Sequence, residues 1–362
     1  ELRFPEFEGE WEEKQLGNII KVNSGKDYKH LDKGDIPVYG TGGYMTSVSE
    51  PLSEIDAVGI GRKGTINKPY LLEAPFWTVD TLFYCTPKKE TDILFILSLF
   101  RKINWKVYDE STGVPSLSKQ TINKINRFVP TNKEQQKIGK FFSKLDRQIE
   151  LEEQKLELLQ QQKKGYMQKI FSQELRFKDE NGNDYPDWTN ERLGEVTTVT
   201  MGQSPKSVNY TDNSNDTVLI QGNADIENGL INPRIYTREV TKLIQKDEII
   251  LTVRAPVGKL AMAQINACIG RGVCSIKGDK FLYYFLEWFA TQNKWIRFSQ
   301  GSTFESISGN DIRNIHIKIP VEDERTKIIK LLNSLDVLNS KTDLKIQNLK
   351  QRKQSLLQKI FV

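Results

Sequence analysis

The sequence predicts an α+β protein in which two related globular domains are separated by a long antiparallel two-helix coiled coil. Three observations support this fold class. The chain contains a long internal repeat, each copy ends in a segment with coiled-coil spacing, and each copy begins with short strand-like runs between turn residues. The order of these parts implies an internal pseudo-two-fold symmetry.

The repeat is clearest in two charged segments. Pro130–Phe171 aligns without a gap with Pro320–Phe361, and the two are identical at 15 of 42 positions. The match continues upstream, where Trp105 corresponds to Trp295. The two copies are offset by 190 residues, which is far longer than the repeat of a solenoid. Each copy is therefore expected to be a domain with an appended segment.

Both charged segments are predicted to be long helices, because their seam residues recur at alternating spacings of four and three. The first seam is Ile138, Phe142, Leu145, Ile149, Glu152, Leu156, Leu159, Lys163, Tyr166 and Ile170. The second is Ile328, Leu332, Leu335, Asn339, Thr342, Ile346, Leu349, Lys353, Leu356 and Ile360. Antiparallel pairing is favoured because the second helix then begins where the first ends. Two amphipathic helices packed on separate globules are the alternative.

The expected boundaries are 1–129 for the first globule, 130–172 for the first helix, 173–319 for the second globule and 320–362 for the second helix. Each globule mixes strand-like runs, such as Phe76–Cys85, with one longer helix near its end. These helices are expected at Asp92–Tyr108 and Asp279–Phe298. No finer topology follows from the periodicity.

Composition excludes several classes of protein. The net charge of +5 and pI near 8.8 are compatible with a nucleic-acid partner but insufficient to indicate one. Three cysteines and two histidines, without a Cys-x-x-Cys motif, argue against a disulfide framework and a zinc site. The apolar run Ile93–Phe100 is shorter than the roughly 20 residues needed to cross a bilayer. We expect a cytoplasmic protein without a membrane partner, whose lack of an initial methionine indicates a trimmed N-terminus.

The stretch GIGRKGTINKPY, Gly59–Tyr70, resembles two unrelated motifs. Its G-x-G-x-x-G spacing suits a dinucleotide loop, but Pro69 and Pro75 prevent the helix that such a loop requires. Its NKPY lacks the second-position proline of the Asn-Pro-Pro-Tyr motif of adenine-N6 methyltransferases. We expect a strand end and loop in which glycines permit close approach of a binding partner and Arg62 and Lys63 reach toward it. No catalytic, metal-binding or cofactor-binding residues are predicted in this chain.

The segments LRFPEFEGEW, EQQKIGKFFSKLD and the helix end QKIF, with their counterparts in the second copy, resemble the specificity subunit of type I restriction-modification systems. The resemblance covers nearly the whole chain. It implies that each globule is a target recognition domain for one half of a bipartite, asymmetric DNA sequence.

The same resemblance implies that the coiled coil sets the spacer and docks two methyltransferase subunits and, through them, the restriction subunits. S-adenosylmethionine is then expected on the methyltransferase subunit, and this chain is expected not to be an enzyme. The alternatives are a recognition half of a split methylase-nuclease and a coiled-coil scaffold with two protein-binding domains. A scaffold would show no salt-dependent DNA binding.

Polar and basic residues in loops are the candidates for DNA contact, because such side chains bind phosphates and base edges. In the first copy they are Lys26, Tyr28, Lys29, Thr41, Tyr44, Arg62, Lys63, Thr65, Thr112 and Gly113. In the second they are Gln203, Ser204, Lys206, Gln221, Asn223, Arg254, Lys259, Arg271, Ser302 and Thr303. Arg62 and Arg254 are expected to be equivalent. The bases that are recognised cannot be derived from the sequence.

Overall fold

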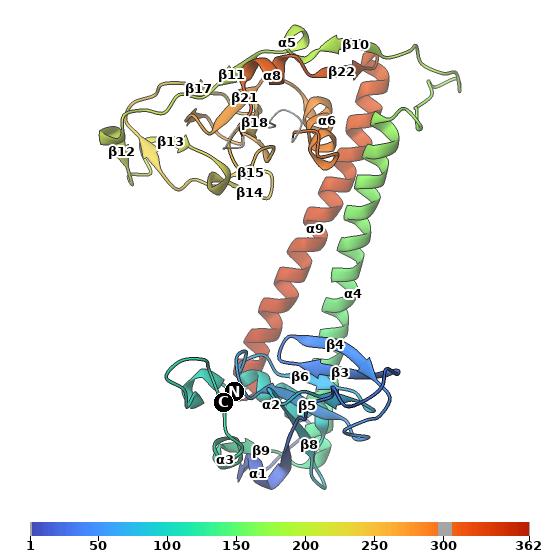
Figure 1. The fold of residues 1–362 in the computed structure, drawn as a ribbon, viewed down its shortest axis with the longest axis vertical. Coiled ribbons are helices and arrows are strands. Elements are labelled where there is room, and N and C mark those ends of the chain that lie inside the picture. The colour runs from blue at the N-terminus through green and yellow to red at the C-terminus, as the bar shows by residue number, and fades with distance from the viewer. Residues whose placement is uncertain (1, 296–305, 362) are drawn as a thin grey trace. The chain divides into compact units, whose positions relative to one another are not determined.

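The computed structural model describes residues 2–295 and 306–361. The chain divides into two compact units, one comprising Glu1–Lys155 with Thr342–Val362 and the other Leu156–Lys341. Each unit contains a globule of short strands and helices together with part of each long helix, so the predicted α+β class is confirmed. Figure 1 labels the elements.

The first unit begins with a small sheeted globule. Its elements are β1 (Glu12–Gln15), α1 (Leu16–Ile19), β2 (Ile20–Ser24), β3 (Ile36–Gly40), β4 (Gly43–Val48), β5 (Ala57–Gly61), β6 (Tyr70–Leu72), β7 (Trp77–Thr78), β8 (Leu82–Pro87), α2 (Ile93–Lys102), the 3-10 turn Trp105–Tyr108, α3 (Lys119–Lys124), β9 (Asn126–Val129) and the start of α4 (Asn132–Phe171). The strands form three sheets with the orders β2-β8-β5-β6, β4-β3-β7 and β1-β9.

The second unit repeats this arrangement with additional short strands. Its elements are β10 (Thr189–Arg192), α5 (Leu193–Val196), β11 (Val199–Met201), the 3-10 turn Ser207–Asn209, β12 (Tyr210–Thr211), β13 (Thr217–Ile220), the 3-10 turn Asn223–Asp225, β14 (Ile226–Glu227), β15 (Leu230–Ile231), β16 (Tyr236–Thr237), β17 (Leu243–Ile244), β18 (Ile249–Thr252), β19 (Leu260–Met262), β20 (Ala267–Ile269), β21 (Val273–Ile276), α6 (Lys280–Thr291), α8 (Gly309–Arg313), β22 (His316–Ile319) and the start of α9 (Glu322–Ile360). The sheet orders are β11-β21-β18-β19-β15-β14, β12-β16-β13-β20-β17 and β10-β22.

The two globules share one topology. The strand order β2-β8-β5-β6 corresponds to β11-β21-β18-β19, and the parallel pair β3–β7 corresponds to the parallel pair β13–β20. Leu16 donates its backbone N–H to Ile125, and Leu193 donates equivalently to Ile315, both at 2.8 Å. The internal repeat seen in the sequence is therefore a repeat of hydrogen-bonded structure.

The helix of each globule is shorter than its apolar pattern predicts. Helix α2 ends at Lys102 because Ile103 adopts an extended backbone and the Trp105 indole N–H donates to the Phe100 carbonyl at 2.8 Å. That bond satisfies one of the carbonyls that every helix end leaves unpaired. In the second unit α6 ends at Thr291, and the last three residues of its expected range, 296–298, lie outside the described residues.

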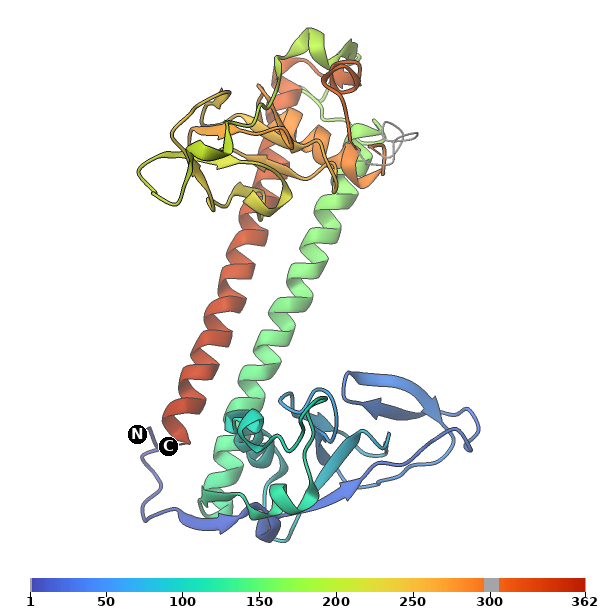
Figure 2. The ribbon, with the colours of Figure 1, turned by 60° about the vertical axis from the view of Figure 1, so that its left-hand side comes forward.

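The predicted antiparallel pairing of the long helices is confirmed within each unit. In the first unit Lys353 pairs with Asp146 and Lys345 with Glu152, so the α9 number falls as the α4 number rises. In the second, Lys163 of α4 contacts Asp336 of α9 at 2.7 Å, and Met167 and Ile170 share a core with Leu332 and Ile328. Figure 2 shows the start of α4 beside the end of α9.

The shared QKIF ends dock each helix into a globular core. Phe361, directly after α9, lies 5.6 Å from the Phe95 ring of α2 and 6.3 Å from the Phe142 ring of α4. Phe171, the last residue of α4, lies 5.6 Å from the Phe281 ring of α6. The core of each unit therefore extends from its sheets across both long helices, which holds the globule against them.

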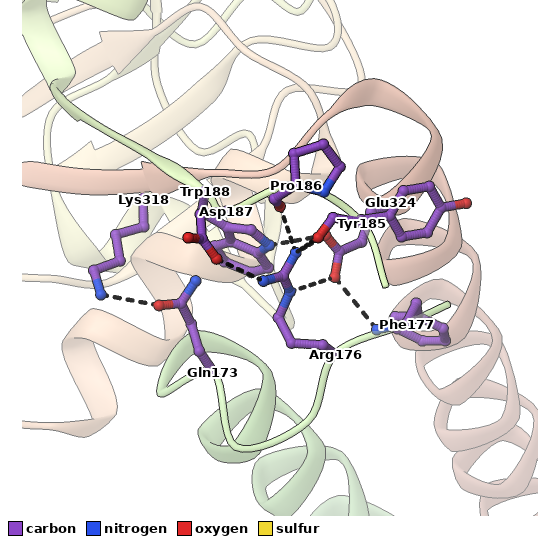
Figure 3. A network of polar contacts seen from close by, with 9 residues as sticks. All are labelled: Gln173, Arg176, Phe177, Tyr185, Pro186, Asp187, Trp188, Lys318 and Glu324. Carbon is purple, nitrogen blue, oxygen red and sulfur yellow. Dashed lines mark hydrogen bonds and ion pairs between the residues drawn. The ribbon is translucent and has the colours of Figure 1, made fainter. Parts of the chain in front are cut away.

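An ion pair between a partly exposed arginine and a buried glutamate joins the segment that leads into each globule to the start of a long helix. In the second unit Arg176 donates two hydrogen bonds to the carboxylate of Glu324, from Nε and from Nη2, both at 2.8 Å. The Trp188 indole N–H donates to the same carboxylate at 2.9 Å (Figure 3). Glu324 also holds the pKa of Arg176 above its ordinary value. The first unit repeats this clamp with Arg3, Glu134 and Trp11.

Candidate nucleic-acid interface

The candidate site of the first globule is organised by the turn Val79–Thr81, which joins β7 to β8. The sequence predicts one continuous run over Phe76–Cys85, but the structure breaks it at this turn. Three loops are bonded to the turn and its flank. These backbone bonds, donor first, run from Val79 to Tyr39 at 3.0 Å, from Arg62 to Thr81 at 2.8 Å and from Lys26 to Thr78 at 2.8 Å. We call Val79–Thr81 the first hub turn.

The second globule has the same arrangement around Gly270–Gly272, the second hub turn. Its backbone bonds, donor first, run from Gly270 to Ile220 at 2.8 Å, from Val253 to Gly272 at 2.9 Å and from Gln203 to Ile269 at 2.9 Å. Each bond has a counterpart in the first globule. The hub turns therefore hold equivalent loops in equivalent places.

Tight backbone contacts explain two glycines beside the hub turns. A Cβ on Gly25 would lie 2.0 Å from the Val79 carbonyl oxygen, and one on Gly202 would lie 2.1 Å from that of Gly270. Both distances are far below any tolerated carbon–oxygen contact, so no other residue fits without moving the backbone. Gly25 and Gly202 thus place the following residues, Lys26 and Gln203, beside their hub turns.

Most of the candidates in the first copy are exposed around this framework. Lys26, Lys29, Tyr44, Arg62, Lys63, Thr112 and Gly113 are exposed, and Tyr28, Thr41 and Thr65 are partly buried. Tyr28 packs against the small core of Val38, Val48 and Trp77, which gives it a structural role. Thr41 and Tyr44 lie at the hairpin between β3 and β4.

The loop around Thr112 is held in place by one carboxylate. Asp109 accepts hydrogen bonds from the backbone N–H groups of Ser116 at 2.9 Å and Ser111 at 3.0 Å. These bonds, chiefly that from Ser116, lower the pKa of Asp109. The exposed Thr112 and Gly113 are thereby presented on an ordered loop.

The glycines of GIGRKGTINKPY serve the fold of the chain itself. A Cβ on Gly61 would lie 2.1 Å from the Thr65 carbonyl oxygen, so this glycine lets the chain turn back on itself. Gly64 has a positive φ of 85°, where a side chain is strained. The segment is a strand end and loop as predicted, but Gly61 approaches protein backbone, and the next regular element is strand β6.

The candidates of the second copy differ in how exposed their side chains are and in whether those side chains are bonded within the protein. Gln203, Lys206, Arg254 and Arg271 are exposed, Ser204, Gln221, Asn223 and Lys259 are partly buried, and Ser302 and Thr303 lie outside the described residues. The Lys259 ammonium donates to the carbonyls of Asn223 at 3.1 Å and Ile226 at 2.6 Å. Lys259 therefore shapes the loop that carries Asn223, which makes its direct contact with a phosphate less favourable.

The expected equivalence of Arg62 and Arg254 is wrong by one residue. The Arg62 carbonyl accepts from Leu117 and the Val253 carbonyl accepts from Ile307, both at 2.9 Å. Likewise Lys63 bridges to Ser116 as Arg254 bridges to Ser306. The equivalent basic residues are therefore Lys63 and Arg254. The alignment of the two copies at this point follows their hydrogen bonds and not the similarity of the sequence motifs.

One residue at the first hub turn was absent from the sequence-based candidates. Asp80 is exposed at its tip, where the second hub turn carries Arg271. Valine and threonine favour strands, so the run VDT does not look like a turn. In the other copy, the two glycines of Gly270–Gly272 indicate a turn. Aligning that turn with the first copy would have identified Asp80 as its tip.

The described residues contain no group of three or more His, Cys, Asp or Glu side chains placed to hold a metal ion. Within the same part of the chain, no helix has both the length and the apolar character required to cross a membrane. The three cysteines are buried and free, and burial raises the pKa of the Cys274 thiol to about 12. The exposed polar loops at the hub turns remain the best-supported candidate site.

Comparison with known proteins gives consistent matches. The family model described as "Type I restriction modification DNA specificity domain" matches residues 8–161 and 185–351. The putative type I restriction enzyme MjaX specificity subunit of Methanocaldococcus jannaschii is 30% identical over 261 residues, covering 68% of this chain and 61% of that protein. The MjaVIII specificity subunit of the same organism is 25% identical over 312 residues, covering 79% of this chain and 71% of that protein.

Two solved structures share the fold. The S subunit of a type I restriction-modification system from M. genitalium matches with a TM-score of 0.69 at 16% identity, covering 97% of this chain and 96% of that chain. A chain from a study of complex assembly and conformational transition in a type I R-M system matches with a TM-score of 0.61 at 19% identity, covering 97% of both chains.

Proposed function

The chain belongs to the family of type I restriction-modification DNA specificity domains, and we propose that it is the sequence-recognition subunit of a type I restriction-modification complex. Each globule recognises one half of a bipartite, asymmetric duplex target. The paired helices set the spacer between the half-sites. The proposal includes a cytoplasmic location, where such a complex meets DNA.

The observation that carries the proposal is the pair of hub turns. The same hydrogen-bonded framework occurs in both globules, but the exposed side chains at equivalent positions differ. Lys26 corresponds to Gln203, and Asp80 corresponds to Arg271. A framework that is kept while its polar side chains change suits two domains that dock alike and recognise different bases.

The chemistry of methylation and cleavage is assigned to partners. In this proposal two methyltransferase subunits dock on the helices, carry S-adenosylmethionine and methylate adenine N6, and the restriction subunits join through them. The residues of this chain bind and orient DNA: lysine and arginine neutralise phosphates, and Gln, Asn and Arg side chains pair with base edges. No step of bond making is assigned to this chain.

The proposal is tested with the chain assembled with its methyltransferase partner. Methylated adenines are first mapped in DNA of the source cell to obtain the target, and binding is then measured on duplexes with one half-site scrambled. Scrambling either half should weaken binding at least about tenfold, since each lost base contact weakens discrimination. Equal binding to intact and scrambled duplexes would overturn the proposal.

A further inference from the structure

The tips of the two hub turns carry opposite charges. Asp80 and Arg271 are both exposed, and both sit between residues whose backbone groups make equivalent bonds. Among the residues that the structure describes, neither the Asp80 carboxylate nor the Arg271 guanidinium has a hydrogen bond or an ion pair. These side chains are therefore available to a ligand, and the protein presents them in the same way.

A carboxylate at this position needs a specific explanation. On a surface that meets DNA, phosphates repel it, so Asp80 gains nothing from the backbone of the duplex. In the major groove, only the amino groups of cytosine and adenine donate hydrogen bonds, whereas guanine and thymine present acceptors. An ionised carboxylate is an acceptor only, and it can pair only with those amino groups.

The neighbours of Asp80 favour such a contact. Arg62 donates from Nη1 to the Asp80 carbonyl at 3.4 Å, so its guanidinium lies beside the turn, and the exposed Lys63 follows it in the chain. Cations on this flank suit phosphates beside a groove, which would leave the carboxylate at the tip to meet bases. At the second hub turn the tip is itself a donor, Arg271, and guanine offers it two acceptors, N7 and O6.

We propose that Asp80 and Arg271 are equivalent specificity-determining residues of opposite hydrogen-bonding polarity. Asp80 accepts a hydrogen bond from the exocyclic amino group of a base in the first half-site and excludes guanine and thymine there. Arg271 donates to guanine in the second half-site. This inference rests on the proposed function and adds to it the residue in each globule that discriminates one base position.

The experiment uses the chain assembled with its methyltransferase partner and duplex libraries in which each position of both half-sites is randomised. D80A should lose the preference at one position of the first half-site by roughly 10- to 100-fold and leave the second half-site unchanged. A wild-type preference for cytosine or for adenine at that position identifies which amino group is bound. D80R should move the preference at the same position to guanine.

R271A should lose a guanine preference at one position of the second half-site only. The matched control is E54A, because Glu54 is an exposed acid of the first globule that lines a hollow with Asn132 of α4, away from the hub turn. E54A should leave every preference unchanged. Thermal unfolding of each variant shows whether the fold is retained, as expected for exposed side chains.

Two outcomes distinguish this inference from the function on which it rests. If wild type is sequence-specific while D80A and R271A, both folded, keep all of its base preferences, the assignment of Asp80 and Arg271 is overturned and the proposed function stands. If wild type itself shows no preference at any position, the proposed function fails, and the inference fails with it.

Discussion

Glu134 and Glu324 are fully buried carboxylates, which makes them unusual among the charged residues of this chain. Each lies in the first turn of a long helix, where the helix dipole favours a negative charge. Each is also gripped by an arginine and an indole N–H from the segment leading into its globule. Because every partner is present, the burial of the charge is compensated, and loss of one partner would leave the others unpaired.

Replacing Glu324 with alanine should therefore destabilise the second unit. E324A leaves the Arg176 guanidinium and the Trp188 indole N–H without their shared acceptor, and we expect a loss of about 2–3 kcal/mol in the free energy of unfolding. Denaturant titration measures this loss, and hydrogen exchange should increase in 172–188. D184A is the control, because it removes the exposed ion pair with Lys178 and leaves every hydrogen bond to Glu324 in place, and it should unfold nearly like wild type. Equal stability of E324A and D184A would contradict the role given to the clamp.

At the scale of the helices, two equivalent lysines interrupt the apolar seams in different electrostatic surroundings. Lys163 lies 2.7 Å from both Glu287 and Asp336, so one cation serves two carboxylates. Lys353 faces Asp146, which Arg101 also contacts, so two cations share one carboxylate. Burial raises the pKa of Glu287, and burial together with Arg101 lowers the pKa of Lys353.

These surroundings predict that removing the two lysines lowers stability by different amounts and with different pH dependence. K163M leaves two neighbouring carboxylates without their cation, and we expect a loss of about 2 kcal/mol near neutral pH, below the value for a fully buried pair because both carboxylates are partly exposed. Lys163 is among the groups that lower the pKa of Glu287, so K163M raises this pKa further above the unfolded value, and stability is then lost as the pH rises through it. The K163M deficit should therefore shrink as the pH falls from 8 toward 5.

The matched variant K353M should lose less of the free energy of unfolding than K163M. It leaves Asp146 paired with Arg101 and removes a lysine whose pKa is already lowered. Its deficit should not shrink on acidification, since no pair of unshielded carboxylates remains. Thermal unfolding of both variants across this pH range measures the difference, and identical pH profiles for K163M and K353M would contradict the assignment.

The contrast between long helices and short turns explains how much could be predicted from the sequence. The seam of α4 and α9 extends over many turns, so no single polar interruption obscures the pattern, and the helices and their pairing were predicted correctly. The first hub turn spans three residues and contains two strand formers, so local propensity concealed it. Its position depends on bonds to Tyr39 and Arg62, which are distant in the chain.

The structure tests the exposure of the candidate residues and the register between the two copies, but not their contact with DNA. Residue type and loop position indicated Arg62 and Lys63 in the first globule and Arg254 and Arg271 in the second, and all four side chains are exposed, each pair near the hub turn of its own globule. The one-residue error in matching Arg62 to Arg254 arose because motif similarity was used where strand pairing decides. Contact of any of these residues with DNA stays a prediction.

For the whole molecule, charge is distributed unevenly along the chain. Helix α4 contains nine Lys and Arg against six Asp and Glu, and α9 contains nine against five. The net charges of the two helices, +3 and +4, together exceed the +5 of the whole chain, so the residues outside these helices carry a net charge of −2. The chain outside these helices therefore has no net positive charge to attract DNA, and the proposed recognition by the globules would depend on local groups of cations, such as Arg62 with Lys63.

The proposed spacer function of the helices predicts a change in target geometry. Inserting one heptad into α4 after Lys155 and one into α9 after Lys341, with apolar residues at the seam positions, preserves the 4-3 spacing and adds about 10 Å of helix. Since base pairs rise by about 3.4 Å, the preferred spacer should lengthen by about three base pairs with unchanged half-sites.

Binding to duplexes of graded spacer length measures this change, with the chain assembled with its methyltransferase partner. Insertion into α4 alone is the control, because it moves Lys163 out of register with Asp336 and should lower stability without selecting a new spacer. If the helices set the spacer, the double insertion must shift the optimum, because α4 and α9 each contribute residues to both units. An optimum that stays at the wild-type spacer in a folded double-insertion variant would show that something other than helix length sets the distance between half-sites.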